Sequence, residues 1–171
     1  PRLPPESNSL EHPWWSHGRM SWIETSCQAV LAARHLVAMA AVLGRRDEVV
    51  ALEQEADALT RHINSRMWDE ADAYYYDRWH DGRLNGCKSV AGYWTLLADI
   101  IPPERVTRFV QHLRNSAEFN RPHRVPTLSA DNPLYHPGGD YWRGSVWAPT
   151  NYVILKGLCA HGEDALAHEI A

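Results

Sequence analysis

A long apolar helix near the start of the chain most constrains how this sequence can fold. Residues 21–43 are rich in alanine, valine and leucine. The predicted helix is therefore apolar on nearly every side and must pack against several partners. Gly44 is expected to end it as a C-cap, and Asp47 is expected to cap a second helix that runs to Met67 with a charged outer face. Two helices joined by so short a turn predict an antiparallel pair.

The rest of the chain alternates between helices and turns. Further helices are predicted over residues 88–100, 104–113, 145–160 and from 163 onward. The Asp81-Gly82 dipeptide is a strong hairpin-turn signal and follows alternating aromatic and polar residues, so one short β-hairpin is expected near residues 73–84. Residues 1–19 are rich in proline, serine and histidine and are expected to form a loop segment. The predicted fold class is all-α with this one hairpin.

Charge and cysteine spacing exclude several kinds of partner. The chain has 171 residues with 17 basic and 21 acidic side chains. Its basic residues are scattered, so no nucleic acid is expected, because phosphate binding needs clustered Lys and Arg. No apolar run approaches the roughly 18 residues of a membrane helix, so no membrane partner is expected. Cys27, Cys87 and Cys159 form no CxxC pair, which predicts no metal site and free thiols in a reducing, cytoplasmic compartment; no cofactor is expected.

A loop of some thirty residues before the fifth helix concentrates the residues that suit sugar binding. So long a loop in a compact domain is usually functional. Tyr141, Trp142 and Trp147 fall within seven positions, and the two tryptophans offer flat ring faces for the C–H face of a sugar. Arg143 supplies a rigid fork of donors. Asn151 lies one helical turn beyond Trp147 and can project toward the same pocket. The alternative is structural: the tryptophans fill a helix junction and Arg143 pairs with a nearby acid.

The stretch DYWRGSVWAPTNYVILKGL closely resembles the signature of glycoside hydrolase family 63. Its relatives include mannosylglycerate- and glucosylglycerate-hydrolase-like enzymes and, more distantly, trehalases. The resemblance extends upstream through INSRMWDEADAYYYD, KSVAGYWTLLADI and VPTLSADNPLY, and so covers most of residues 20–162. It implies an (α/α)6 toroid, the six-hairpin glycosidase fold. The helices predicted here make about half of one, so residues 20–171 are expected to be a partial domain, truncated at both ends, with the rest of its own toroid as a partner.

The same resemblance implies roles for the motif residues. Tyr141, Trp142 and Trp147 match positions at the subsite of the non-reducing sugar, and Arg143 and Asn151 match positions that shape this pocket. The implied mechanism is inverting hydrolysis, in which a general acid and a general base stand roughly 6.5–9.5 Å apart. Both carboxylates are expected outside this chain. Among the acids within this chain, Glu24 and Asp140 are the candidates for a catalytic carboxylate.

The expected function is that of a glycoside hydrolase. Its substrate class would be an α-glucoside or α-mannoside such as mannosylglycerate or glucosylglycerate, and the present chain would form part of the catalytic domain. Whether this chain is itself an enzyme stays open at this stage. The alternative is a non-catalytic carbohydrate-binding or scaffolding half-toroid that keeps the aromatic residues without the acids.

Overall fold

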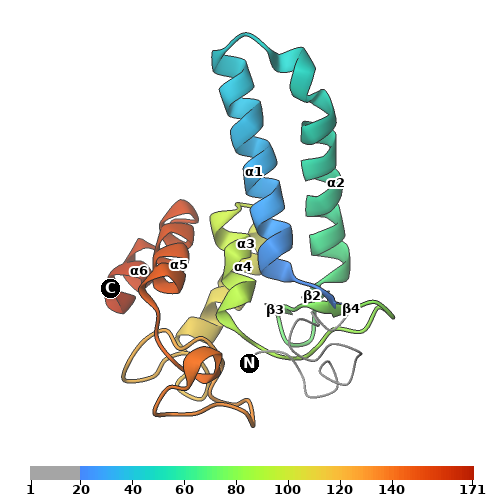
Figure 1. Ribbon diagram of the computed structural model, residues 1–171. Helices are drawn as coiled ribbons and strands as arrows, with labels where there is room; N and C mark the ends of the chain where they lie inside the picture. Colours follow the sequence, from blue (N-terminus) through green and yellow to red (C-terminus); the bar gives the residue numbers. More distant parts are fainter. Residues whose placement is uncertain (1–19) are drawn as a thin grey trace.

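A computed structural model describes residues 20–171, and the loop expected over 1–19 lies outside the described residues. Successive contacts join α2 to α1, α1 to α3, α3 to α5 and α5 to α6. Figure 1 shows α1 and α2 side by side as an antiparallel pair, with α3 and α4 near its lower end and α5 and α6 beyond them. The helices are α1 (Ile23–Val42), α2 (Val50–Arg66), α3 (Trp94–Leu97), α4 (Pro103–Val110), α5 (Ala148–Ala160) and α6 (Asp164–Ile170).

The first helix pair is close to what the sequence predicts. The backbone N–H of Ile23 donates to the buried carboxylate of Asp77 at 2.8 Å, which satisfies a donor at the start of α1 that has no partner within the helix. Gly44 follows the end of α1 with a φ of +69°, as expected of a C-cap residue. The predicted cap at Asp47 is wrong: Asp47 lies inside a short 3-10 helix, Arg46–Val49, and α2 begins at Val50.

The third and fifth helices are shorter than predicted because long-range contacts hold their first residues in extended conformation. Ser89 pairs with Leu128 as an isolated β-bridge, so a 3-10 helix begins only at Val90 and α3 covers Trp94–Leu97. In the same way, a bridge between Val146 and Pro126 delays the start of α5 until Ala148. Helix periodicity in the sequence does not record these pairings, which join residues far apart in the chain.

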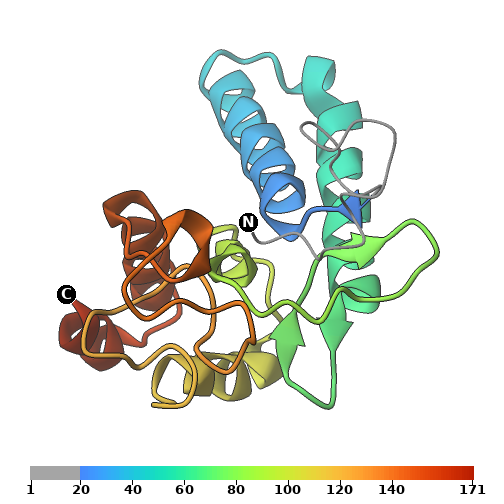
Figure 2. The same ribbon diagram turned by 60° about the horizontal axis from the view of Figure 1, so that its bottom comes forward.

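Four two-residue strands lie at the foot of the α1–α2 pair (Figure 2). They are β1 (Met20–Ser21), β2 (Trp68–Asp69), β3 (Tyr74–Tyr75) and β4 (Arg78–Trp79). Antiparallel pairing joins β2 to β3 and β1 to β4. The predicted turn at Asp81-Gly82 forms, with an isolated bridge between Arg78 and Leu84. The hairpin expected near residues 73–84 therefore closes over residues 78–84, and two small strand pairs that were not predicted accompany it, since β4 also pairs with the entry to α1.

An aromatic core holds the helices and strands together. Tyr74, Tyr93 and Phe109 are fully buried, and the Phe109 ring lies 5.1 Å from Tyr74 and 4.9 Å from Tyr93 between ring centroids. Tilted and edge-to-face contacts of this kind add to the energy of burying the rings. The Tyr74 hydroxyl donates to the Ser89 carbonyl at 2.7 Å, so the core also fixes the segment that precedes α3.

The helix α1 differs from expectation in one further property. At 20 residues, Ile23–Val42 is long and apolar enough to cross a membrane by length and composition alone. No such segment was expected from the sequence, because short polar interruptions divide the apolar run. Although α1 packs on α2 and α3, only 22% of its most apolar stretch is buried among the described residues.

The closest approach between α3 and α5 generates a stability prediction. A Cβ added at Gly157 would lie 2.6 Å from the Leu96 Cβ and 2.9 Å from the Leu97 backbone nitrogen. Overpacking of this kind costs about 1–3 kcal/mol, which exceeds the roughly 1 kcal/mol that alanine gains over glycine in a helix. Gly157→Ala should therefore lower the urea midpoint of unfolding. The exposed neighbour variant Lys156→Ala should leave it unchanged, and a raised midpoint for Gly157→Ala would contradict this packing.

Candidate functional site

The aromatic site is carried by a loop that two β-bridges hold against the rest of the fold. Residues 125–129 run in extended conformation between the segment before α3 and the segment before α5. On one side Val90 N–H donates to the Thr127 carbonyl at 3.1 Å, and on the other Thr127 N–H donates to the Ser145 carbonyl at 3.0 Å. Residues 125–129 are all buried. They form the backing on which the turn at 141–145 is built.

Thr127 fixes this turn through its side chain as well as its backbone. Its hydroxyl oxygen accepts a hydrogen bond from the Gly144 N–H at 3.2 Å and donates to the Tyr141 carbonyl at 3.4 Å. Only glycine suits position 144, because its φ is +147° and a Cβ there would lie 2.5 Å from the His136 carbonyl oxygen. Tyr141 also has a positive φ, +51°, in a short 3-10 helix, Tyr141–Arg143. The turn is thus strained and closely supported.

The structure brings the three predicted aromatic residues together. The Trp142 and Trp147 rings are stacked, with centroids 5.3 Å apart and planes inclined by 2°. The Tyr141 ring lies edge-on to both, 5.7 Å from Trp142 and 5.2 Å from Trp147. Tyr141 is exposed and both tryptophans are half-buried. One face of each tryptophan ring is therefore covered by the other tryptophan, while part of the cluster stays exposed to solvent.

Arg143 and Asn151 are engaged with the loop itself. The Arg143 guanidinium lies 3.1 Å from the Asp140 carboxylate, and its Nε donates to the Leu134 carbonyl at 3.0 Å. The Asn151 side chain accepts from Val125 N–H at 3.1 Å and donates to the Arg124 carbonyl at 3.0 Å. Both residues therefore stabilise the loop segments around the aromatic cluster. The pairing of Arg143 with Asp140 is the contact that the structural alternative, in which Arg143 pairs with a nearby acid, predicts. A direct contact of either residue with a sugar stays a prediction.

A buried charged network anchors the other end of the loop, and no sequence pattern predicted it. Lys88 Nζ lies 2.6 Å from Glu118 and 3.2 Å from Asp72. The other Glu118 oxygen lies 2.6 Å from His112 Nδ1. Burial alone would lower the pKa of Lys88, but its hydrogen bond and attraction to Glu118, helped by Asp72, outweigh burial and raise that pKa. The ammonium therefore stays charged inside the fold.

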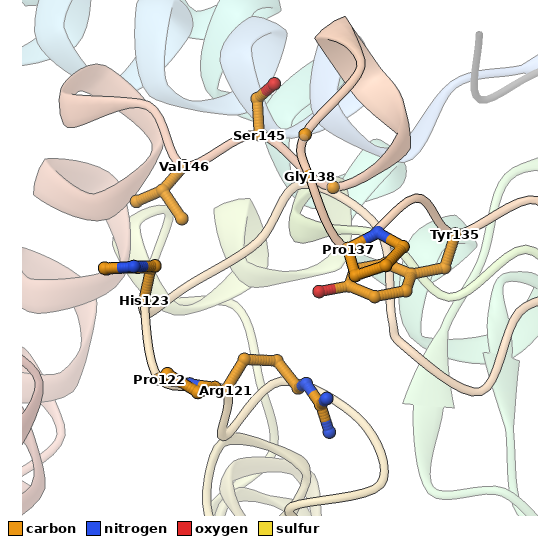
Figure 3. A pocket seen from close by; sticks show the side chains of 10 residues that line it. Arg121, Pro122, His123, Tyr135, Pro137, Gly138, Ser145 and Val146 are labelled. Atoms are coloured by element: carbon orange, nitrogen blue, oxygen red, sulfur yellow. The ribbon is translucent and has the colours of Figure 1, made fainter.

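A cavity of about 430 Å³ opens between residues 121–123 and the loop 135–146 (Figure 3). Its size lies in the range of small-molecule sites. The rings of Tyr141, Trp142 and Trp147 are not among its described walls. The side chains that form most of its wall are Arg121, Pro122, His123, Tyr135, Pro137 and Val146. None of these residues was predicted from the sequence, because they are not spaced as a motif and come together only in three dimensions.

The two internal candidates for a catalytic acid occupy unrelated places. Glu24 lies in the first turn of α1 and accepts a hydrogen bond from Gln28 at 3.4 Å. Asp140 is exposed beside the aromatic cluster and pairs with Arg143. No contact joins these two carboxylates within residues 20–171, and this part of the chain contains no group of three His, Cys, Asp or Glu side chains placed to bind a metal.

Comparison with known proteins relates this chain to glycoside hydrolases. A family model described as the mannosylglycerate hydrolase MGH1-like glycoside hydrolase domain matches residues 6–171. The chain is 29% identical over 166 residues to a probable mannosyl-oligosaccharide glucosidase of Schizosaccharomyces pombe, covering 92% of this chain and 19% of that protein. It is 29% identical over 103 residues to a mannosylglycerate hydrolase of Thermus thermophilus, covering 59% of this chain and 24% of that protein. The chain thus spans at most about a quarter of these relatives.

Solved structures confirm the fold class. The crystal structure of a Thermus thermophilus family 63 mannosylglycerate hydrolase in complex with Tris matches 88% of this chain and 36% of its own, with a TM-score of 0.79 and 22% identity. Neutral trehalase of Saccharomyces cerevisiae matches 71% of this chain with a TM-score of 0.60. Likeness at such low identity shows the fold alone. The chain is all-α with short strands, and its helices form part of an (α/α)6 toroid.

The buried network yields a prediction that separates it from surface ion pairs. Lys88→Met would leave Glu118 buried without its cation, and breaking a buried pair in this way costs about 3–5 kcal/mol. The double variant Lys88→Met/Glu118→Gln removes the unpaired charge and should recover part of the loss. Arg83→Met breaks the exposed Arg83–Asp81 pair and should change the free energy of unfolding by about 1 kcal/mol or less. A small effect of Lys88→Met in urea unfolding would contradict the network.

The Thr127 hydroxyl yields a second prediction. Thr127→Val keeps the shape of the side chain but leaves the Gly144 N–H without its acceptor inside the fold. An unsatisfied buried donor costs about 1–3 kcal/mol, so the variant should unfold at correspondingly lower urea concentration. Thr127→Ser keeps the hydroxyl and should lose much less. Equal stability of the valine and serine variants would show that these hydrogen bonds do not hold the turn.

Proposed function

Because the chain belongs to the mannosylglycerate hydrolase MGH1-like glycoside hydrolase family, we propose that it forms part of the catalytic domain of an inverting glycosidase. Its substrate class is an α-linked glucoside or mannoside such as mannosylglycerate or glucosylglycerate. The similarity to two relatives, a mannosylglycerate hydrolase and a probable mannosyl-oligosaccharide glucosidase, supports this class. The observation that carries the proposal is the cluster of Tyr141, Trp142 and Trp147 on a turn held by hydrogen bonds with Thr127.

This chain contributes the sugar-binding surface in the proposed mechanism. The outward face of the Trp142–Trp147 stack would exclude water from the apolar face of the sugar ring, and the exposed Tyr141 would close one side. Arg143 and Asn151 hold the walls of the loop, so the rings are in place before the sugar arrives. Such preorganisation lowers the cost of binding, since few side chains have to be ordered by the ligand.

The hydrolytic step needs two carboxylates on opposite faces of the scissile bond. We assign them to the longer protein, outside residues 20–171, because Glu24 and Asp140 show no paired arrangement. The isolated chain should therefore turn over little or no mannosylglycerate, glucosylglycerate or trehalose. Clear turnover that is lost in Glu24→Gln or Asp140→Asn would overturn this assignment. Sugar binding without turnover in the longer protein would favour the alternative, a carbohydrate-binding or scaffolding half-toroid.

The ring cluster is tested by calorimetric titration with mannosylglycerate and methyl α-D-mannoside. Truncating a central aromatic contact typically costs about 2 kcal/mol, so Trp142→Ala should weaken binding by roughly 30-fold. Trp142→Phe keeps a flat ring and should lose less. Arg143→Lys should also weaken sugar binding, because an ammonium cannot reproduce the guanidinium fork that reaches Asp140 and Leu134.

Melting measured on the same samples separates binding from bracing, because Trp142 also packs on Trp147. A Trp142→Ala protein that melts far lower but binds sugar normally when folded would show that the cluster is structural. Lys156→Ala, on the exposed side of α5, is the control and should change neither binding nor melting.

A further inference from the structure

An apolar stripe on α1 stays exposed to solvent along most of the helix. Leu36, Met39 and the C-cap residue Leu43 are 48%, 60% and 68% exposed. With the exposed Ala29 and Ala32 they recur at intervals of three and four residues, which is the a/d spacing of helices that pack side by side. Figure 1 shows the α1–α2 pair rising beyond α3 and α5. One face of α1 therefore has the pattern of a packed surface, and residues 20–171 leave it uncovered.

The stripe faces away from the helices that follow in the chain. Arg34, two positions before Leu36, donates to the carbonyl of Ala98 at the end of α3. Successive residues of a helix are turned by about 100°, so Leu36 lies about 200° around α1 from Arg34. The packing of α1 on α3 thus uses one side of the helix, and the stripe lies on the other.

Beside the stripe, α1 and α2 enclose a groove of about 250 Å³. Both of its walls are apolar and carry residues three and four positions apart, which is the arrangement into which the side-chain ridge of a third helix packs. The wall residues are Ala29, Ala32 and Leu36 on α1, and Leu52, Ala56 and Leu59 on α2.

Side-chain size and charge in the groove specify the helix that fits it. Ala29 and Ala32 leave room for large side chains of a partner, whereas Leu36 and Met39 require small ones. Distances between packed helix axes vary over about 8–10 Å with the side chains at the contact, so the partner lies closer to α1 at Ala29 than at Met39. Glu55 also lines the groove and forms no ion pair within residues 20–171, so a Lys or Arg of the partner would complete it.

We propose that this groove binds an amphipathic helix from another part of the same polypeptide, with its apolar seam on Leu36 and Met39. The chain matches 36% of a solved structure whose fold it shares, so a protein of this fold contains further helices. The contacts from α2 through α1, α3 and α5 to α6 leave the α1–α2 pair at one end of the series. A helix of the same polypeptide also has a higher effective concentration than a second copy. The proposal rests on the proposed function only in placing this chain within a longer protein.

Thiol labelling of the full-length protein measures whether the stripe is covered. Cys159→Ser removes the exposed native thiol, and each rate is normalised to the protein unfolded in urea. Met39→Cys should react with maleimide at least about tenfold more slowly than Arg61→Cys, which corresponds to 1.4 kcal/mol of opening free energy. Arg61 is the control, because it is exposed and lies two positions from Leu59, on the side of α2 away from the groove.

A pair of charge substitutions tests the stripe itself. Leu36→Lys should remove the protection of Met39→Cys and lower the urea midpoint of the full-length protein, because the lysine would place a charge between packed helices. Val42→Lys makes a similar change at a side chain that is 88% exposed and lies outside the stripe, and it should do neither. Equal effects of the two lysines would contradict the assigned face.

Photo-crosslinking identifies the occupant. Benzophenone maleimide attached to Gln28→Cys, at the exposed edge of the stripe, should join a peptide of the same polypeptide from outside residues 20–171. Mixing unlabelled and nitrogen-15-labelled protein distinguishes a second copy, which would give crosslinked peptides of mixed isotope content and overturn the proposal. Rapid labelling of Met39→Cys would also overturn it, as would protection that appears only with phosphatidylcholine–phosphatidylglycerol vesicles. Sugar and turnover enter none of these readouts, so failure here is distinct from failure of the hydrolytic proposal.

Discussion

A lysine side chain enclosed by protein is the contact on which the loop depends. Lys88 and Glu118 are each 6% exposed, and their 2.6 Å contact joins the segment before α3 to the beginning of the long loop. Transferring both charges from water is costly, so the pair is stable only because further partners complete it. Asp72 and His112 supply those partners. Four separate parts of the chain therefore meet around the Lys88–Glu118 pair.

The aromatic cluster is connected to this network by a short series of backbone contacts. Lys88 and Ser89 lie beside Leu128 and Ser129, because the Ser129 N–H donates to the Lys88 carbonyl at 3.0 Å. Thr127, next in the same extended segment, carries the turn that presents Tyr141. The buried ion pairs thus hold in place the segment on which the surface turn with its aromatic rings is built. Long loops are usually mobile, and here the ladder of contacts removes that freedom over 125–129 and 144–146.

Local periodicity accounts for the parts of the fold that the sequence predicted well. The α1–α2 pair is defined by spacing within each helix and by Gly44, so its ends were placed within a few residues. The late starts of α3 and α5 could not be predicted, since they follow from pairing of residues 89 and 146 with a distant segment. The same holds for the strands, where the partner of β4 is the entry to α1.

In the candidate site, too, features that depend on neighbouring residues were predictable and features that depend on distant residues were not. Clustering of Tyr141, Trp142 and Trp147 was predictable because they fall within seven positions, and the structure brings their rings together. The stacking of the tryptophans on each other was not, as it depends on the turn geometry. Lys88 and Thr127 were missed because each matters through contacts with residues far away in sequence, and a single Lys or Thr carries no pattern.

At Tyr141 the backbone conformation and the aromatic side chain place opposite demands on the residue type. A tyrosine with a φ of +51° occupies a backbone conformation that costs of order 1–3 kcal/mol for a residue with a side chain. Glycine would relieve this cost, and most substitutions that relax the turn would also remove the ring. The residue that best stabilises the fold at this position is therefore not the one that builds the cluster. Selection for thermal stability alone would therefore favour glycine at this position and erode the aromatic surface.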